Sequence, residues 1–158
     1  MQSARTHPLI LGYLGRSLSL EYTAVQQYMS QAALCEAWGL QEAATRFRQE
    51  TVEEMKHAER LIKRMLGLGV APNASVLQPA SMARSLVDLL RQDMQLESKI
   101  IALYDEATRF CRRVQDHENA AFFEALLQEE THHGAEIENW LIELGAVQNR
   151  ENDERVYF

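Results

Sequence analysis

The residues best suited to chemistry lie in the stretch LLQEETHHGAEIENW, residues 126–140, where two Glu-x-x-His patterns overlap. Glu129 precedes His132 by three positions, and Glu130 precedes His133 by three. Side chains three residues apart lie on one face of a helix, so either pair would place a carboxylate beside an imidazole. These two groups together suit divalent transition metals. The pair that faces the interior therefore decides where a metal ion could bind.

An internal repeat separates the two pairs. When the chain is shifted by 76 residues, core positions coincide, as Leu14 falls on Leu90 and Met65 on Leu141. Polar residues coincide as well, which core packing alone does not require: Glu21 falls on Glu97, Tyr28 on Tyr104, Glu54 on Glu130 and His57 on His133. His132 falls on Lys56. We therefore expect Glu130 and His133 to face inward and His132 to face solvent.

Six residues are predicted to converge at one level of a helical bundle. Glu21 and Glu97 each interrupt an apolar stripe, and the two repeated Glu-x-x-His pairs add Glu54, His57, Glu130 and His133. Buried carboxylates are costly unless they are protonated or paired, and no Lys or Arg lies on these inward faces. Two divalent metal ions would compensate four carboxylates, and this ligand set favours iron or manganese over zinc. A single Glu-x-x-His more often marks a solvated face, but two with matched glutamates are specific.

Three further polar residues lie on the same faces. Tyr28 and Tyr104 each follow their glutamate by seven residues, so they are either core tyrosines with satisfied hydroxyls or neighbours of the metal ions. Asp93 precedes Glu97 by one helical turn and could orient a histidine.

The elements that must position these residues are four helices in a single domain, residues 1–158. Apolar periodicity and the breaks at Gly39, Pro72 and Pro79 predict helices over about 8–38, 40–68, 80–115 and 117–145, with a tail at 146–158. The first and last connections are short, whereas the middle one, about a dozen residues, is long enough to cross the bundle. The sequence therefore predicts an all-α, ferritin-like four-helix bundle of two antiparallel hairpins joined by a long crossover.

Composition excludes several functions. The formal net charge is −7 and no basic stripe occurs, so nucleic acid is not an expected partner. No apolar run reaches membrane-spanning length and no secretory signal is evident, so we expect a cytoplasmic protein that does not enter a membrane. Cys35 and Cys111 stand alone, which argues against a zinc ribbon or a disulfide framework.

The run EEMKHAERL, together with the six ligands and the segments EYTAVQQY, WGL, APN and RQDMQLE, resembles the bacterioferritins over nearly the whole chain. The resemblance implies that Glu54 and Glu130 bridge two irons, while Glu21 with His57 and Glu97 with His133 complete the separate positions. It also implies oxidation of Fe(II) by dioxygen or hydrogen peroxide. The ferric mineral would be stored in a homo-oligomeric shell built from two-fold dimers, usually of twenty-four subunits.

Met55 carries a further implication of this resemblance. It lies one residue after Glu54, so it points toward a flank of the helix rather than into the core. In bacterioferritins this methionine, from each of two subunits, ligates the iron of one haem, so a b-type haem at a two-fold interface is expected. The resemblance also suggests a small ferredoxin as the electron donor that releases stored iron.

Two departures and two alternatives remain open. Gln49 and Glu53 occupy the neighbourhood of an inner-surface histidine found in some members, so an iron relay of that type is not expected. The tail VQNRENDERVYF is more charged than the family's fifth helix, which keeps a shell of twelve subunits possible. The alternatives are a stand-alone di-iron or di-manganese peroxidase or oxidase of rubrerythrin type, and a helical scaffold without enzymatic activity.

Overall fold

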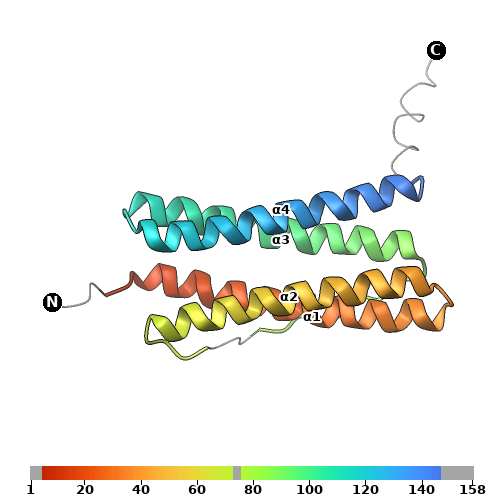
Figure 1. Ribbon diagram of the computed structural model, residues 1–158, viewed down its shortest axis with the longest axis horizontal. Coiled ribbons are helices and arrows are strands. Elements are labelled where there is room, and N and C mark those ends of the chain that lie inside the picture. Colours follow the sequence, from red (N-terminus) through yellow and green to blue (C-terminus); the bar gives the residue numbers. More distant parts are fainter. Residues whose placement is uncertain (1–4, 73–75, 147–158) are drawn as a thin grey trace, which may run out of the picture.

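The computed structural model describes residues 5–72 and 76–146, and within these ranges it contains four long α-helices and no strand (Figure 1). The helices are α1 (Pro8–Ala37), α2 (Gln41–Gly67), α3 (Leu86–Arg113) and α4 (His117–Glu143). The predicted all-α bundle of two antiparallel hairpins is confirmed. The tail from residue 147 lies outside the described residues, and so does the expectation for a fifth helix.

Tight turns close the two hairpins. Gly39, directly after α1, has a φ of 78°, in the left-handed region that glycine adopts without a Cβ clash. Gln115 occupies the same region after α3, with a φ of 60°. Asp116 then caps α4, because its side-chain Oδ1 accepts a hydrogen bond of 3.0 Å from the Asn119 amide. Each pair of helices is therefore antiparallel.

The third helix begins at Leu86, so the expected start near residue 80 is wrong. Ser85 is extended, with a φ of −143°, and its Oγ accepts a hydrogen bond of 3.2 Å from the Asp88 amide. A serine in this position satisfies an otherwise free helix N–H and so fixes the start. The connection thus spans residues 68 to 85, and within its described part the amides of Val76 and Gln78 donate to Ser19 and Thr23 of α1.

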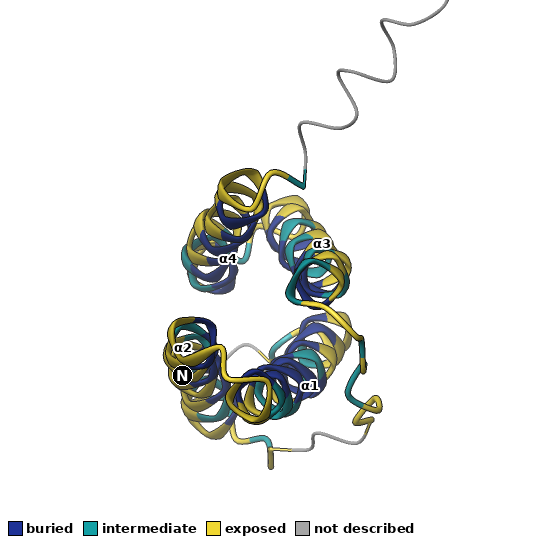
Figure 2. Cartoon of the chain, turned by 90° about the vertical axis from the view of Figure 1, so that its right-hand side faces the viewer, coloured by how far each residue is buried: buried dark blue, intermediate teal, exposed yellow. Residues whose placement is uncertain are grey.

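The core lies on the axis of the bundle, where buried residues of all four helices meet (Figure 2). Helix α1 packs along α2, α3 packs along α4, and α1 also contacts α3. Fully buried side chains include Leu14, Phe47, Leu61, Leu90 and Phe123. Burying one such side chain stabilises the fold by about 2 kcal/mol. This apolar packing above and below the middle of the bundle holds the helices in register there.

Charged side chains connect α2 to α4. Ion pairs join Arg46 to Glu143 at 3.6 Å, Arg60 to Glu129 at 2.6 Å and Arg64 to Glu118 at 2.8 Å. In all three pairs, the arginine belongs to α2 and the glutamate to α4. We call this the α2–α4 seam.

Among the described residues, no helix combines the length and the apolar character needed to cross a membrane.

Candidate di-metal centre

The six predicted ligands come together in the middle of the bundle. They come from all four helices: Glu21 from α1, Glu54 and His57 from α2, Glu97 from α3, and Glu130 and His133 from α4. All four glutamates are fully buried, and the two histidines are 5 and 6% exposed. The ligand atoms form two groups of four, each within 4.8 Å: Glu21, Glu54, His57 and Glu130, and Glu54, Glu97, Glu130 and His133. Two metal positions that share Glu54 and Glu130 would fit this arrangement.

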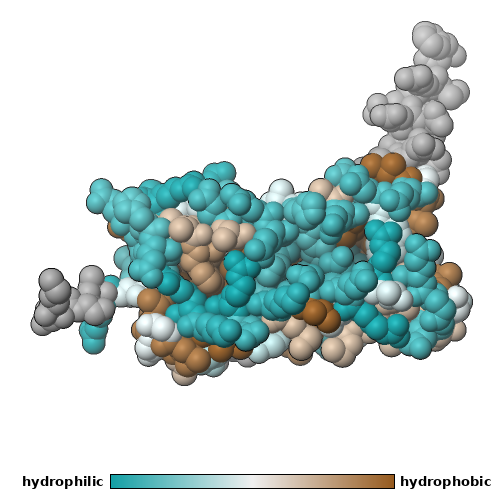
Figure 3. Space-filling model, in the orientation of Figure 1, coloured by the Kyte–Doolittle hydropathy of each residue, from teal (hydrophilic) through white to brown (hydrophobic). Residues whose placement is uncertain are grey.

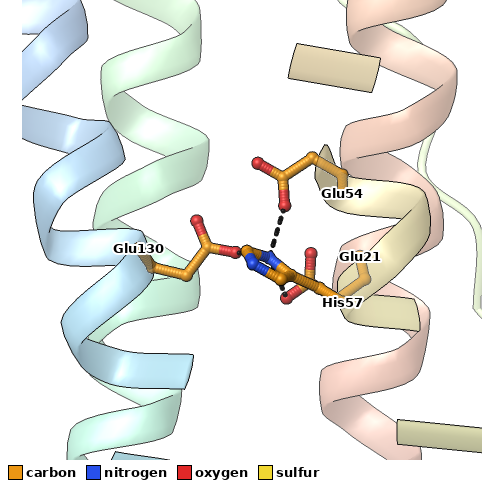
Figure 4. Close-up of side chains that lie close together, drawn as sticks. All are labelled: Glu21, Glu54, His57 and Glu130. Carbon is orange, nitrogen blue, oxygen red and sulfur yellow. Dashed lines mark hydrogen bonds and ion pairs between the residues drawn. The ribbon is translucent and has the colours of Figure 1, made fainter. Parts of the chain in front are cut away.

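The first group surrounds the Nδ1 atom of His57. This nitrogen lies 2.7 Å from Glu130 Oε1, 3.0 Å from Glu54 Oε2 and 3.7 Å from Glu21 Oε1. Figure 4 shows Glu130 reaching from α4 toward His57 and Glu54 on α2 and Glu21 on α1. The four side chains therefore span the interior between the two hairpins.

The second group repeats this arrangement around His133. Its Nδ1 atom lies 2.8 Å from Glu54 Oε1, 3.0 Å from Glu97 Oε1 and 3.5 Å from Glu130 Oε2. Glu54 and Glu130 thus direct one oxygen toward each histidine. A carboxylate with its two oxygens in two neighbouring groups is placed to bridge two metal ions.

The outer nitrogens of both histidines face carboxylates that were not predicted as site residues. His57 Nε2 lies 2.8 Å from Oε2 of Glu129, and His133 Nε2 contacts Glu50. The sequence repeat did not indicate Glu129, because its counterpart Glu53 is followed three residues later by a lysine and not by a histidine. Only the register of α4 against α2 reveals these contacts. His132 is exposed, as expected, and pairs with Glu136 at 3.2 Å.

The two tyrosines touch the centre. Tyr28 and Tyr104 are fully buried. The Tyr28 hydroxyl donates a hydrogen bond of 2.5 Å to Glu97, and the Tyr104 hydroxyl donates one of 2.5 Å to Glu21. Each tyrosine therefore binds the glutamate of the other hairpin. Both are core tyrosines whose hydroxyls are paired, and a role beside metal ions stays a prediction.

Asp93 does not bind a histidine, so the expected role in orienting one is wrong. Its Oδ1 accepts hydrogen bonds of 2.7 Å from both Gln27 and Gln31 of α1, because Asp93 faces α1 from its place on α3. Burial raises the pKa of Asp93 to about 7, although both glutamine bonds act in the opposite direction. Asp93 thus joins the hairpins beside the centre.

Protons are distributed unevenly among the six ligands. Burial raises the pKa of Glu21 and of Glu97 well above the ordinary value, which favours the protonated form of these outer carboxyls when no metal ion is bound. Burial would also raise the pKa of Glu130, but hydrogen bonds from His133 and His57 lower it. For the two histidines burial favours a lower pKa, and the surrounding carboxylates raise it instead. When no metal ion is bound, protons on the outer glutamates and on the histidines thus offset the negative charge of the cluster.

Unpaired oxygen atoms indicate that the centre fits metal ions. One buried oxygen on each of the four glutamates has no hydrogen bond of good geometry, although two of them lie near His133 Nδ1, Glu54 Oε1 at 2.8 Å and Glu130 Oε2 at 3.5 Å; the other two are Glu21 Oε2 and Glu97 Oε2. Leaving such groups without partners is costly, and buried polar atoms are paired in most proteins. Metal coordination would satisfy all four oxygens at once, and a set of carboxylates and imidazoles suits iron or manganese.

A hollow of about 310 Å³ leads to the centre between α2 and α4. Glu54, His57 and His133 line its inner end, and Glu50, His132 and Glu136 are among the residues that line the rest. The face crossed by α2 and α4 is largely hydrophilic in Figure 3. A small hydrated cation could therefore approach the ligands from this side of the bundle.

Met55 lies apart from the six ligands. It is 53% exposed on α2, although the preceding residue, Glu54, is fully buried. Tyr22 and Met29 of α1 and Val52 of α2 are also exposed, at 37, 55 and 50%. These four residues form what we call the α1–α2 apolar face. Figure 3 shows hydrophobic side chains gathered over α1 and α2 along the lower edge of the molecule.

Four helices around paired carboxylate–histidine groups define the ferritin-like class, and the ferritin-like domain family matches residues 11–146. Among curated relatives, bacterioferritin of Rhodobacter capsulatus is 35% identical over 78% of this chain and 77% of its own, and that of Mycobacterium leprae is 30% identical over 89 and 88%. The chain belongs to the bacterioferritin family. A solved structure of the Rhodobacter capsulatus protein, described with a metal-free dinuclear site and a haem iron, superposes with a TM-score of 0.82 at 32% identity, covering 86% of this chain and 85% of that one.

Proposed function

We propose that this protein is an iron-storage subunit with ferroxidase activity, which oxidises Fe(II) at the di-metal centre. The observation that carries the proposal is the pair of four-residue groups that share Glu54 and Glu130. Family membership supports it, because the chain matches bacterioferritins over most of its length.

In this proposal the two Fe(II) ions are substrates held by the six side chains. Glu54 and Glu130 would bridge them, Glu21 and His57 would complete one position, and Glu97 and His133 would complete the other. Each ion gives up one electron. Dioxygen takes up both electrons and two protons to form hydrogen peroxide, or hydrogen peroxide takes up both electrons and two protons to form two water molecules. Carboxylates favour the more highly charged Fe(III), so this ligand set favours oxidation. The protons displaced from Glu21, Glu97 and the histidines are available at the centre.

Storage requires a closed assembly, and the α1–α2 apolar face is a candidate for the two-fold contact. Apolar side chains exposed together on two adjacent helices are typical of surfaces that a partner covers. We propose a homo-oligomeric shell of twenty-four subunits, or of twelve, built from such dimers. A ferredoxin remains the proposed electron donor for iron release.

Met55 is the candidate axial ligand of a b-type haem at this contact. The chemistry of the residues fits a haem: the Met55 side chain is half exposed, and further apolar side chains of α1 and α2 are exposed as well. Two copies of Met55 related by a two-fold axis would supply both axial ligands. When bound, the haem would supply one-electron transfer.

The test replaces Glu54 with Ala and follows Fe(II) oxidation by stopped-flow absorbance under air. We expect Glu54→Ala to abolish the rapid phase, because it removes a ligand common to both positions. Glu59→Ala is the matched control, since Glu59 lies on the same helix and pairs only with Lys63 at the surface. If Glu54→Ala oxidised Fe(II) as fast as the unaltered protein, the assignment of the centre would be wrong.

A further inference from the structure

We propose that Glu129 is a positioning residue for the Glu21–His57 half of the di-metal centre, where it holds the His57 imidazole with Nδ1 directed at the ligand cluster. The inference rests on the proposed function, because it concerns one of the two metal positions assigned there. It gives a role to a glutamate that belongs to neither predicted pair of inward ligands.

Two contacts to one oxygen of the Glu129 carboxylate fix its position. One oxygen, Oε2, lies 2.8 Å from His57 Nε2 and accepts a hydrogen bond of 2.6 Å from Arg60 Nη1. His57 and Arg60 are three residues apart on α2, so they face the same side of that helix. Glu129 reaches them from α4 and thereby ties the imidazole to the opposite hairpin.

This contact selects the protonation state that a metal ligand needs. An ionised carboxylate can only accept hydrogen bonds, so Glu129 favours the imidazole form with its proton on Nε2. When a metal ion displaces the proton from Nδ1, the lone pair of that nitrogen is directed at the cluster, because Nδ1 lies 2.7 Å from Glu130 and 3.0 Å from Glu54. A ligand histidine that donates its other N–H to a carboxylate is oriented and made more basic, and loss of such a partner weakens metal binding by about 10- to 100-fold.

The other half of the centre lacks an equivalent arrangement. Glu53, which the 76-residue repeat places opposite Glu129, has an exposed side chain and pairs with Lys56 at 2.9 Å. His133 Nε2 meets Glu50 of α2 instead, a residue that the 76-residue repeat does not relate to Glu129. The described contacts of Glu50 include no Lys or Arg. The two metal positions are therefore supported in different ways, and loss of Glu129 should affect only one of them.

The experiment is a titration of the purified, assembled protein with Co(II) under argon, followed by the visible d–d absorption and by calorimetry. The variants are Glu129→Ala, which removes the carboxylate, and Glu129→Gln, which keeps its shape. In Glu129→Gln the amide oxygen can still accept from both Arg60 and His57, because Oε2 alone makes both contacts, but the negative charge beside the imidazole is lost. Glu53→Ala is the matched control, because it removes the repeat counterpart from the same surface.

We expect the unaltered protein and Glu53→Ala to bind two Co(II) ions per subunit. Glu129→Ala should keep one ion at unchanged affinity and bind the second about 10- to 100-fold more weakly, and Glu129→Gln, which keeps an oxygen acceptor, should weaken that second ion less. Two-ion binding by the Glu129 variants with unaltered affinities would overturn the inference, and so would equal weakening of both positions. If the unaltered protein itself bound fewer than two ions, the proposed function would fail first.

Discussion

The hydroxyl of Tyr28 on α1 donates a hydrogen bond of 2.5 Å to Glu97 on α3. The repeat-related bond runs in the opposite direction, from Tyr104 on α3 to Glu21 on α1. Each tyrosine thus holds the outer carboxylate of the other hairpin. A buried hydroxyl and a buried carboxyl oxygen that pair with each other avoid the cost of being left without partners, so these two contacts hold the outer ligands in place.

Removing either hydroxyl should loosen one outer ligand without removing it. We expect Tyr28→Phe and Tyr104→Phe each to destabilise the protein by about 1–3 kcal/mol, because a buried carboxyl oxygen loses its donor. Fe(II) oxidation should slow several-fold rather than stop. Thermal unfolding and stopped-flow oxidation would measure both effects. Tyr22→Phe is the control for oxidation, since it removes the hydroxyl of a partly exposed tyrosine of α1 outside the ligand cluster and should leave the rate unchanged.

Metal binding should release protons and strengthen as the pH rises. Two histidines with raised pKa values must lose the proton from the ligating nitrogen, and Glu21 and Glu97, whose pKa values are also raised, must ionise. Calorimetric titration with Zn(II) in two buffers of different ionisation enthalpy would count the protons released per ion. Affinity that did not change between pH 6 and pH 8 would contradict the proton distribution described above.

Asp93 should make the protein less stable as the pH rises. Its pKa is about 7 in the folded chain, against an ordinary value of 3.8, so the folded state retains a proton that the unfolded state releases. The contribution of Asp93 to the free energy of unfolding is therefore largest below about pH 4, and it declines as the pH rises toward 7. Asp93→Asn keeps the oxygen that accepts from Gln27 and Gln31 but cannot ionise.

Urea unfolding of the metal-free protein, followed by circular dichroism at pH 5 and pH 8, would test this. We compare the free energy of unfolding of Asp93→Asn with that of the unaltered protein. The difference should favour the variant by about 1–3 kcal/mol more at pH 8 than at pH 5. Asp105→Asn, on the exposed side of the same helix, should show no such difference.

Met55 should be required for haem and dispensable for iron oxidation. We expect Met55→Leu, which keeps the volume and the apolar character of the face, to lose the Soret band of the purified protein. Its rate of Fe(II) oxidation should be unchanged, because Met55 lies outside the six-ligand cluster. Absorption spectra and native mass of the same preparation would report haem content and assembly together.

Much of the fold and of the ligand cluster could be predicted because it depends on periodicity. Helical spacing identified four helices, and the 76-residue repeat separated Glu130 and His133 from the overlapping Glu129 and His132. The start of α3 could not be predicted, because the apolar period continues toward residue 80 and the decisive contact is the cap by Ser85.

The contacts around the cluster could not be predicted for a different reason. Glu50 and Glu129 reach the histidines across the gap between α2 and α4, and Asp93 finds its partners on α1. Such contacts depend on how far one helix is displaced along another and on side-chain rotamers. A sequence repeat compares residues within each half, so it carries no information on this displacement.

The α2–α4 seam makes one side of the bundle sensitive to ionic strength. Its three arginine–acid pairs involve exposed acids, and salt screens such pairs strongly, whereas the apolar contacts between α1 and α3 are not screened. Backbone amides of α2 and α4 should therefore exchange with deuterium faster at about 1 M salt than at about 0.05 M, while those of α1 and α3 keep their protection. The hollow that leads to the six-residue cluster lies between the same two helices and includes Glu129 of the seam, so salt should also loosen the side of the bundle from which the cluster is reached.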